Sequence, residues 1–259
     1  MNSYETLSEY YDRFTDDVGY EEWADFFERL FEREGVKPSL VLDLACGTGS
    51  LTRILAQRGY DMIGADASPE MLMQALQNTL DCEPRPLLLN QRMEELDLYG
   101  AVDACLCCLD SVNYVTEPEA LQTAFERVHT FLNPDGLFVF DINTPEKFAR
   151  IDGESYVRED DGVFCVWQGG GGRGRPVRLP VRYFRAGGRC VAPCAGNARG
   201  AHLRACTADR HAGAGRLYRD QNLWRPVLCA RTGRRGPHLL YSTKERLTYE
   251  RYVTSRDRP

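Results

Sequence analysis

Short apolar runs alternate with amphipathic helical patterns along the first half of the chain, and this alternation constrains the fold more than any other feature. The runs cover residues 39–45, 61–66, 86–90, 102–109 and 137–142. They are nearly continuous in hydrophobic residues, which is typical of strands buried on both faces. Strands that are separated by helices pair in parallel. The sequence therefore predicts an α/β fold with a doubly wound, mostly parallel sheet.

Two connecting helices carry start signals. Ser68 followed by Pro69 has the pattern of an N-cap and a first helical residue. Thr116 with Glu119 three residues later has the pattern of a capping box. The connection around residues 92–100 shows no clear period, so helix and strand both stay open there.

The N-terminal region, residues 1–34, is predicted to be helical. Its apolar residues recur at spacings of three and four, and acidic residues fill the positions between them. These apolar residues are Trp23, Phe26, Phe27, Leu30 and Phe31. We expect this single apolar face to cover another part of the protein.

The composition fits a globular protein that stays in the cytoplasm. The chain has 259 residues, of which 43% are hydrophobic, enough to fill a core. No stretch approaches the ~18 consecutive apolar residues of a membrane span, and the acidic start lacks the regions of a secretory signal. Ten cysteines in a chain of this length are expected to stay reduced. We expect a cytoplasmic location and no membrane contact.

The formal net charge of −6 conceals two parts of opposite sign. Residues 1–168 carry −21, whereas residues 169–259 carry +15, with 19 Arg against one Lys. The second part has no Ile or Met, and Leu, Val, Phe and Ile make up only 14 of its 91 residues. A chain needs about one-fifth of such residues to pack a core. The sequence predicts a folded domain over 1–168 and an aberrant or disordered Arg/Gly-rich tail over 169–259.

Three interpretations of this tail are open. An abrupt loss of acidic residues with a gain of Arg, Gly and Cys favours an out-of-frame translation after Gln168, which would leave the product with impaired catalysis. A basic segment with scattered Tyr could instead bind RNA through phosphate contacts and stacking. A zinc module is the weakest alternative, because chance explains its spacing better. Its ligands would be Cys190, Cys194, Cys206 and His211.

The segment 41–50, VLDLACGTGS, contains the residues that point to a ligand. A strand ends with Asp43, and small residues occupy alternate positions before the next helix, at Ala45, Gly47 and Gly49. Small residues let the backbone approach a ligand, and a helix N-terminus offers free N–H donors. Asp66 ends the next strand, where a carboxylate can accept hydrogen bonds from ribose hydroxyls. These features together predict a cofactor that contains a nucleoside.

Thr52 distinguishes between the classes of nucleoside cofactor. A dinucleotide fingerprint has a third small residue three positions after the second glycine. This chain has Thr52 at that position, so NAD and FAD are disfavoured.

With these motifs in place, the chain resembles a class I S-adenosylmethionine-dependent methyltransferase of the small bacterial type. The resemblance covers residues of about 4–167 and implies a Rossmann-like fold with S-adenosyl-L-methionine as cofactor. It is carried, in the family's order, by DLACGTGSL, GADASPEML, DACLCCLDSVNYV and NPDGLFVFDINTPEKF. The family continues with an antiparallel cap and terminal strands. Because the tail does not match them, we expect these elements to be missing and the last predicted strand to have an open edge.

The resemblance implies contacts for each part of the cofactor. The methionine end is lined by Asp43, Ala45, Cys46, Gly47 and Gly49. The ribose lies at Asp66 and Ala67 and the adenine at Gln91, Arg92 and Met93, whereas Leu109 and Asp110, after the fourth strand, face the cofactor. An N-terminal aromatic lid corresponds to Tyr10, Tyr11 and Tyr20. Ala45 departs from the family, which often has glycine there.

The methyl acceptor is expected to be a small molecule, and RNA and protein are the open alternatives. By the same resemblance, Asn113 and Tyr114 are turned toward the acceptor, and the candidates for any catalytic role are Asp110, Asn113 and Tyr114. Plainer interpretations accompany several of these residues. Asp110 could cap a helix, and Met93 and the N-terminal tyrosines could pack in the core. His129 is a further candidate for a general base and could instead be a surface residue. Cys107 and Cys108 are interpreted as structural thiols on a buried strand.

Overall fold

The computed structural model describes residues 11–142 and a set of strand segments beyond them. These segments are 155–160, 163–168, 177–178, 181–185, 189–192, 199–200, 215–218 and 227–231. Side chains are described for residues 11–142 and for a few positions in the first two segments.

The central sheet has the strand order β12-β13-β5-β4-β1-β2-β3. The five strands β5-β4-β1-β2-β3 pair in parallel, as predicted. Their bounds are β1 (Leu40–Leu44), β2 (Asp61–Asp66), β3 (Leu87–Asn90), β4 (Val102–Cys107) and β5 (Leu132–Asp141). The order reverses between β1 and β4, because the chain starts in the middle of the sheet and returns to extend its other side. Ligands bind at the carboxyl ends of the strands at such a switch point.

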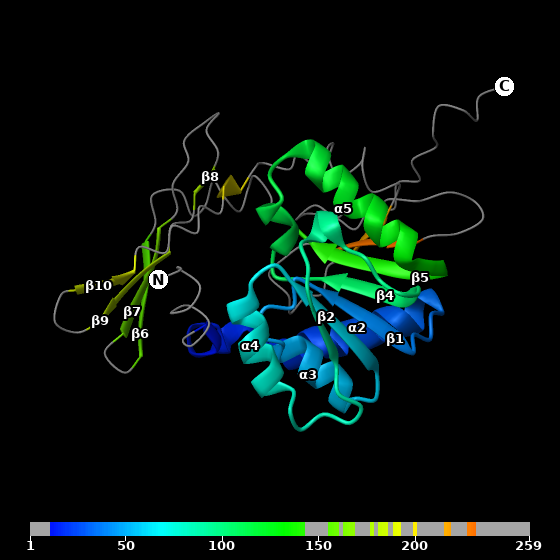
Figure 1. The fold of residues 1–259 in the computed structure, drawn as a ribbon, viewed down its shortest axis with the longest axis horizontal. Coiled ribbons are helices and arrows are strands. Elements are labelled where there is room, and N and C mark those ends of the chain that lie inside the picture. The colour runs from blue at the N-terminus through cyan, green and yellow to red at the C-terminus, as the bar shows by residue number, and fades with distance from the viewer. Residues whose placement is uncertain are drawn as a thin grey trace.

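Helices cover both faces of this sheet, with α5 on one side and α2 and α3 on the other (Figure 1). The helices are α2 (Tyr20–Glu34), α3 (Ser50–Gln57), α4 (Pro69–Asn78) and α5 (Pro118–Phe131). Ser68 caps α4 as predicted, since its Oγ accepts a hydrogen bond from the Met71 backbone N–H at 3.2 Å, and Pro69 begins the helix.

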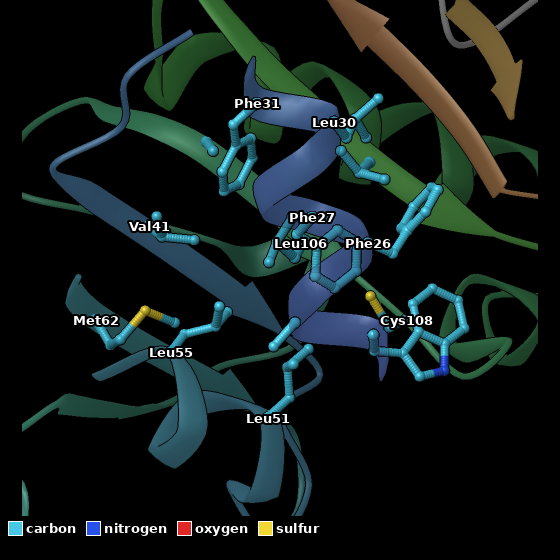
Figure 2. Packing of buried hydrophobic residues seen from close by; sticks show 14 of the residues in the cluster. Phe26, Phe27, Leu30, Phe31, Val41, Leu51, Leu55, Met62, Leu106 and Cys108 are labelled. Atoms are coloured by element: carbon cyan, nitrogen blue, oxygen red, sulfur yellow. The ribbon is translucent and has the colours of Figure 1, made fainter. Parts of the chain in front are cut away.

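The aromatic face predicted in the N-terminal region is confirmed on α2. Phe27 is fully buried, and it lies in one cluster with Val41 of β1, Leu55 of α3 and Leu106 of β4 (Figure 2). A second cluster on the opposite face joins Phe125 of α5 to the sheet. The two layers fix the strand ends that form the pocket described below.

The prediction of one helix over residues 1–34 is wrong within the described residues. Residues 11–14 are helical, and a 3₁₀-helix, η1, covers Asp16–Val18. Gly19 then has φ 65° and separates η1 from α2. Because this left-handed conformation cannot continue a right-handed helix, the segment before α2 follows a path of its own.

The predicted capping box at Thr116 is also wrong. The N-cap of α5 is Glu117, which makes no side-chain cap hydrogen bond, and Pro118 is the first helical residue. A proline forces the residue before it into an extended conformation and has a φ suited to a first helical turn. It therefore moves the start of the helix by one residue. The undecided connection at 92–100 contains a 3₁₀-helix, η2 (Met93–Glu95).

Strands from the tail correct the expectation of an open edge at β5. The strand β13 (Val227–Arg231) pairs antiparallel with β5, and β12 (Gly215–Tyr218) pairs antiparallel with β13. Val, Leu and Cys in β13 suit a strand, and backbone pairing at an open edge does not depend on overall composition. The division of the chain at residue 168 stays a prediction.

A second sheet, of order β10-β9-β7-β6, lies beside the N-terminal segment (Figure 1). Its strands are β6 (Ser155–Asp160), β7 (Val163–Gln168), β9 (Val181–Arg185) and β10 (Arg189–Ala192). The remaining short strands, β8 (Val177–Arg178) and β11 (Arg199–Gly200), pair with each other.

Candidate cofactor-binding site

A pocket opens at the carboxyl ends of β1 and β4, where the strand order reverses. Its empty space of about 460 Å³ includes open solvent. The residues that line it come from the N-terminal segment, α2, the loop after β1, the start of α3 and the loop after β4. They are Tyr11, Tyr20, Trp23, Asp43, Ala45, Cys46, Gly47, Thr48, Leu51, Cys108, Leu109 and Ser111.

The loop after β1 alternates residues in the left-handed conformation. Ala45 has φ 64°, Gly47 has φ 56° and Gly49 has φ 76°. The loop is fixed to the neighbouring strand, because the backbone N–H groups of Ala45 and Cys46 both donate to the Ala65 carbonyl oxygen, at 2.7 and 3.1 Å. The alternate small residues noted in the sequence are therefore the positions at which the backbone of this loop has a positive φ.

Gly47 and Gly49 serve different purposes in this loop. A Cβ on Gly47 would meet nothing within 4 Å, and Gly47 lines the pocket. A Cβ on Gly49 would lie 3.0 Å from the Cβ and 3.2 Å from the Cα of Ala75 in α4. Gly47 therefore leaves room for a ligand, whereas Gly49 allows α3 and α4 to pack closely.

Ala45→Gly is expected to stabilise the protein by about 0.5–1 kcal/mol. A non-glycine residue in the left-handed conformation costs about 1–2 kcal/mol, which the substitution removes. The greater freedom of glycine in the unfolded chain offsets part of this gain. Urea denaturation of the two proteins measures the difference. Ala56→Gly, within α3, is the matched control and should destabilise the protein. An Ala45→Gly variant less stable than the original would contradict this account of the loop.

Asp43 is a buried carboxylate in the wall of the pocket. It is 3% exposed, and its Oδ2 accepts a hydrogen bond from Thr52 Oγ1 at 2.5 Å. Burial raises the pKa of Asp43 from 3.8 to about 6, and the hydrogen bond from Thr52 opposes this rise. Thr52 thus occupies the third small-residue position of a dinucleotide loop in order to hold Asp43.

Asp43→Asn is expected to stabilise the ligand-free protein above pH 6. Because the pKa of the folded state lies above the unfolded value, the protein loses stability as the pH rises from about 4 through 6. The asparagine variant lacks this loss, so it should be more stable at pH 8 by about 2–3 kcal/mol and no more stable at pH 4. Urea denaturation at both pH values measures this, and equal differences at both would contradict it.

Asp66 lies at the end of β2, where it organises the same loop. Its Oδ2 accepts a hydrogen bond from the Gly47 backbone N–H at 2.9 Å, and its Oδ1 accepts one from the Ser68 N–H at 2.8 Å. Burial raises the pKa of this carboxyl, and the two N–H donors oppose the rise. A carboxylate oxygen accepts more than one hydrogen bond, so Asp66 can hold the loop and still bind ribose hydroxyls.

The loop after β4 also adopts left-handed backbone conformations. Leu109 has φ 59° and Asp110 has φ 56°. The Asp110 backbone N–H donates to Asp141 Oδ2 at 2.9 Å, and Ser111 Oγ donates to the Cys108 carbonyl oxygen at 2.6 Å. Unfavourable backbone conformations cluster at functional sites. Here they direct the chain from β4 past the pocket, where Leu109 and Ser111 form part of its lining.

Several predicted site residues lie outside this lining. Gly49 and Asp66 support the loop, and Ala67 follows Asp66. Arg92 is exposed and pairs with Glu94, and Met93 packs against the cluster on the α5 face. Gln91 closes its own loop through the backbone of Asp97. The adenosine contacts of this group stay predictions.

The catalytic candidates Asp110, Asn113 and Tyr114 are not among the residues that line the pocket, although Asp110 lies between Leu109 and Ser111, which do line it. Asn113 is buried in η3 (Ser111–Tyr114), and Tyr114 is 57% exposed. Of the predicted aromatic lid, Tyr11 and Tyr20 line the pocket, whereas Tyr10 is outside the described residues. The catalytic roles of Asp110, Asn113 and Tyr114 stay predictions.

The structure adds pocket residues that the sequence did not single out as ligand contacts. Thr48 and Ser111 are short polar residues that lie next to predicted site residues in the sequence. This position was the only feature of the sequence that could have identified them. Trp23 and Leu51 follow the helical apolar pattern, which indicated only a core. Cys108 belongs to the buried core and also lines the pocket.

The interpretation of the strand cysteines as structural thiols agrees with their surroundings. Cys107 and Cys108 belong to the clusters on opposite faces of the sheet, and burial raises the pKa of both thiols well above the ordinary value. His129 is exposed on α5. Of the zinc alternative, Cys194, Cys206 and His211 lie outside the described residues, and only the strand position of Cys190 is described.

Comparison with known proteins places this site in a family. Residues 41–136 match the family model of a methyltransferase domain. The Bacillus subtilis protein YqeM, a methyltransferase by provisional assignment, is 32% identical over 167 residues, which cover 64% of this chain and 66% of that protein. A glycine/sarcosine N-methyltransferase of Parasynechococcus marenigrum is 29% identical over 165 residues, covering 62% of this chain and 57% of that enzyme.

The fold is also that of a solved methyltransferase. An S-adenosylmethionine-dependent methyltransferase from Clostridium acetobutylicum superposes with a TM-score of 0.71 at 24% identity, covering 90% of this chain and all of that one. The chain belongs to the class I S-adenosylmethionine-dependent methyltransferases. Its cofactor is S-adenosyl-L-methionine. Within the described residues, no helix is both long and apolar enough to cross a membrane.

Proposed function

We propose that this chain transfers the methyl group of S-adenosylmethionine to the nitrogen of a small amine. The observation that carries the proposal is the composition of the pocket wall, which combines one buried carboxylate, Asp43, with the aromatic rings of Tyr11, Tyr20 and Trp23. A carboxylate and aromatic faces both attract cations. They suit a sulfonium ion and an amine better than an anionic ligand. Residues 1–168, with a net charge of −21, add to this attraction.

The cofactor supplies an electrophilic methyl group on a positively charged sulfur. The protein has to hold the acceptor, the methyl carbon and the sulfur in one line, and such positioning contributes about 7–11 kcal/mol to lowering a barrier. The fixed loop after β1 and the loop after β4 both line the pocket and can provide this alignment. The roles of Ala45, Cys46, Gly47 and Leu109 as cofactor contacts are part of the proposal.

The ionisation of the pocket groups favours an amine over a hydroxyl acceptor. Burial raises the pKa of Tyr20 and of the thiols of Cys46 and Cys108, so these groups are protonated at neutral pH. Asp43 accepts the hydrogen bond from Thr52. Asp43 is thus the one group of this set that is ionised at neutral pH, and we assign its charge to the sulfonium rather than to proton removal. An amine that arrives uncharged offers its lone pair without a base.

The matched acceptors glycine and glycolate test this proposal, because they differ in an amine and a hydroxyl. With S-adenosylmethionine present, formation of S-adenosylhomocysteine is expected with glycine or sarcosine, at a rate that increases with pH as the amine loses its proton. No product is expected with glycolate. NAD is the control ligand and should not bind. Methylation of hydroxyl acceptors alone, or failure to bind S-adenosylmethionine, would contradict the proposal.

We also propose that the methyltransferase unit ends near residue 168. The boundary rests on the change of charge and composition at residue 168, and β12 and β13 add to the edge of the central sheet from beyond it. Limited proteolysis should release residues 169–259 and leave cofactor binding intact. Salt-dependent RNA binding by the full chain, lost with the tail, would favour the RNA alternative instead.

A further inference from the structure

The segment before α2, residues 11–18, is joined to the cofactor-binding loop through one carboxylate. Asp12 Oδ1 accepts hydrogen bonds from Thr48 Oγ1 at 2.5 Å and from Ser50 Oγ at 3.3 Å. Asp12 Oδ2 accepts one from Asn78 Nδ2 at 3.1 Å. This single side chain therefore connects the N-terminal segment to the loop after β1, to the start of α3 and to the end of α4.

The partners of Asp12 are themselves held in place. Asn78 Nδ2 also donates to the Thr48 carbonyl oxygen at 2.9 Å, and Asn78 Oδ1 accepts from Gln74 Nε2 at 3.0 Å. Thr48 is 2% exposed and lines the pocket. Because Asn78 is held by contacts that do not involve Asp12, it offers a prepared docking point for the segment.

The other end of the segment is fixed to the second sheet. Arg158 of β6 donates from Nη1 to the Phe14 carbonyl oxygen at 2.9 Å and to Asp16 Oδ1 at 2.7 Å, and its Nη2 lies 2.5 Å from Asp17 Oδ2. The segment thus runs between two anchors. Tyr11, the neighbour of Asp12, lines the pocket at the first anchor.

We propose that Asp12 is a positioning residue that latches residues 11–18 to the cofactor-binding loop and so keeps Tyr11 against the bound cofactor. The inference rests on the proposed function, which makes this pocket the cofactor site. Breaking the contacts of Asp12 frees the wall that carries Tyr11, so the cofactor can leave more easily. Cofactor entry depends less on the latch, because the pocket is already accessible whenever the segment is detached.

Stopped-flow displacement of S-adenosylmethionine tests the latch. In Asp12→Ala, the dissociation rate constant is expected to rise by at least about tenfold, with a much smaller change in the association rate constant, because hydrogen bonds to a charged group are lost. Asp81→Ala is the matched control. Asp81 is an exposed carboxylate that pairs with Arg53, outside the pocket lining, and its removal should leave both rate constants unchanged.

Two further variants separate latching from general loss of structure. Asp12→Asn keeps an oxygen for Thr48 and Ser50 but turns an amide toward Asn78, so its dissociation rate constant should lie between those of the original protein and Asp12→Ala. Thr48→Val should also speed dissociation, and combining it with Asp12→Ala should add little, because both changes break the same contact. Additive effects, or a rate constant in folded Asp12→Ala within twofold of the original, would overturn the proposal.

Trypsin cleavage after Arg13, an exposed residue of the segment, provides a measurement on the ligand-free protein. Cleavage at this bond should be faster in Asp12→Ala than in the original protein, and an unchanged rate would overturn the latch. If the original protein fails to bind S-adenosylmethionine, the proposed function fails, and this cleavage rate alone decides whether Asp12 holds the segment.

Discussion

Asp66→Ala is expected to weaken S-adenosylmethionine binding more than any substitution outside the glycine loop, by at least about tenfold, because each hydrogen bond to a carboxylate contributes about 1.5–3 kcal/mol. The change acts in two ways. It removes the acceptor that we propose for the ribose hydroxyls, and it removes the acceptor for the Gly47 and Ser68 backbone N–H groups. Isothermal titration calorimetry measures the affinity.

Two comparisons separate these contributions. Asp61 lies at the opposite, exposed end of β2, so Asp61→Ala is a matched control that should keep full affinity. Asp66→Asn keeps one oxygen that can hold a backbone N–H, so its affinity should exceed that of Asp66→Ala. Unchanged affinity in a folded Asp66→Ala protein would refute the assignment of Asp66 to the cofactor.

Gly49→Ala is expected to destabilise the protein by about 2–4 kcal/mol, since it adds backbone strain at φ 76° to overpacking against Ala75. Gly47→Ala carries comparable backbone strain at φ 56° but meets no neighbouring atom. It should cost only about 1–2 kcal/mol of stability, and its new methyl group should instead reduce cofactor affinity, because Gly47 lines the pocket.

Urea denaturation and cofactor titration of both variants form the test. Gly49→Ala should show the larger loss of stability. Gly47→Ala should show the larger loss of cofactor affinity relative to its loss of stability. Equal stabilities of the two variants would contradict the packing role of Gly49.

The sequence by itself determined the order and type of the elements from β1 to β5. Strands such as 102–107 are buried on both faces and therefore show an apolar run, and Ser68 with Pro69 marks a helix start through local hydrogen bonding and backbone geometry. The loop with Gly47 and the strand end at Asp66 could be predicted for the same reason, since their backbone and charge requirements act over a few residues.

Only the tertiary structure decided which role each of these residues has. Gly47 and Gly49 have the same residue type and a similar φ, and only the position of Ala75 in α4 gives Gly49 a packing role. The contacts of Asp12 with Thr48 and Asn78 span 36 and 66 residues, and the pairing of β13 with β5 brings the tail to the sheet edge. Contacts between residues so far apart leave no local pattern, because they depend on how the helices and strands pack rather than on the spacing of residues along the chain.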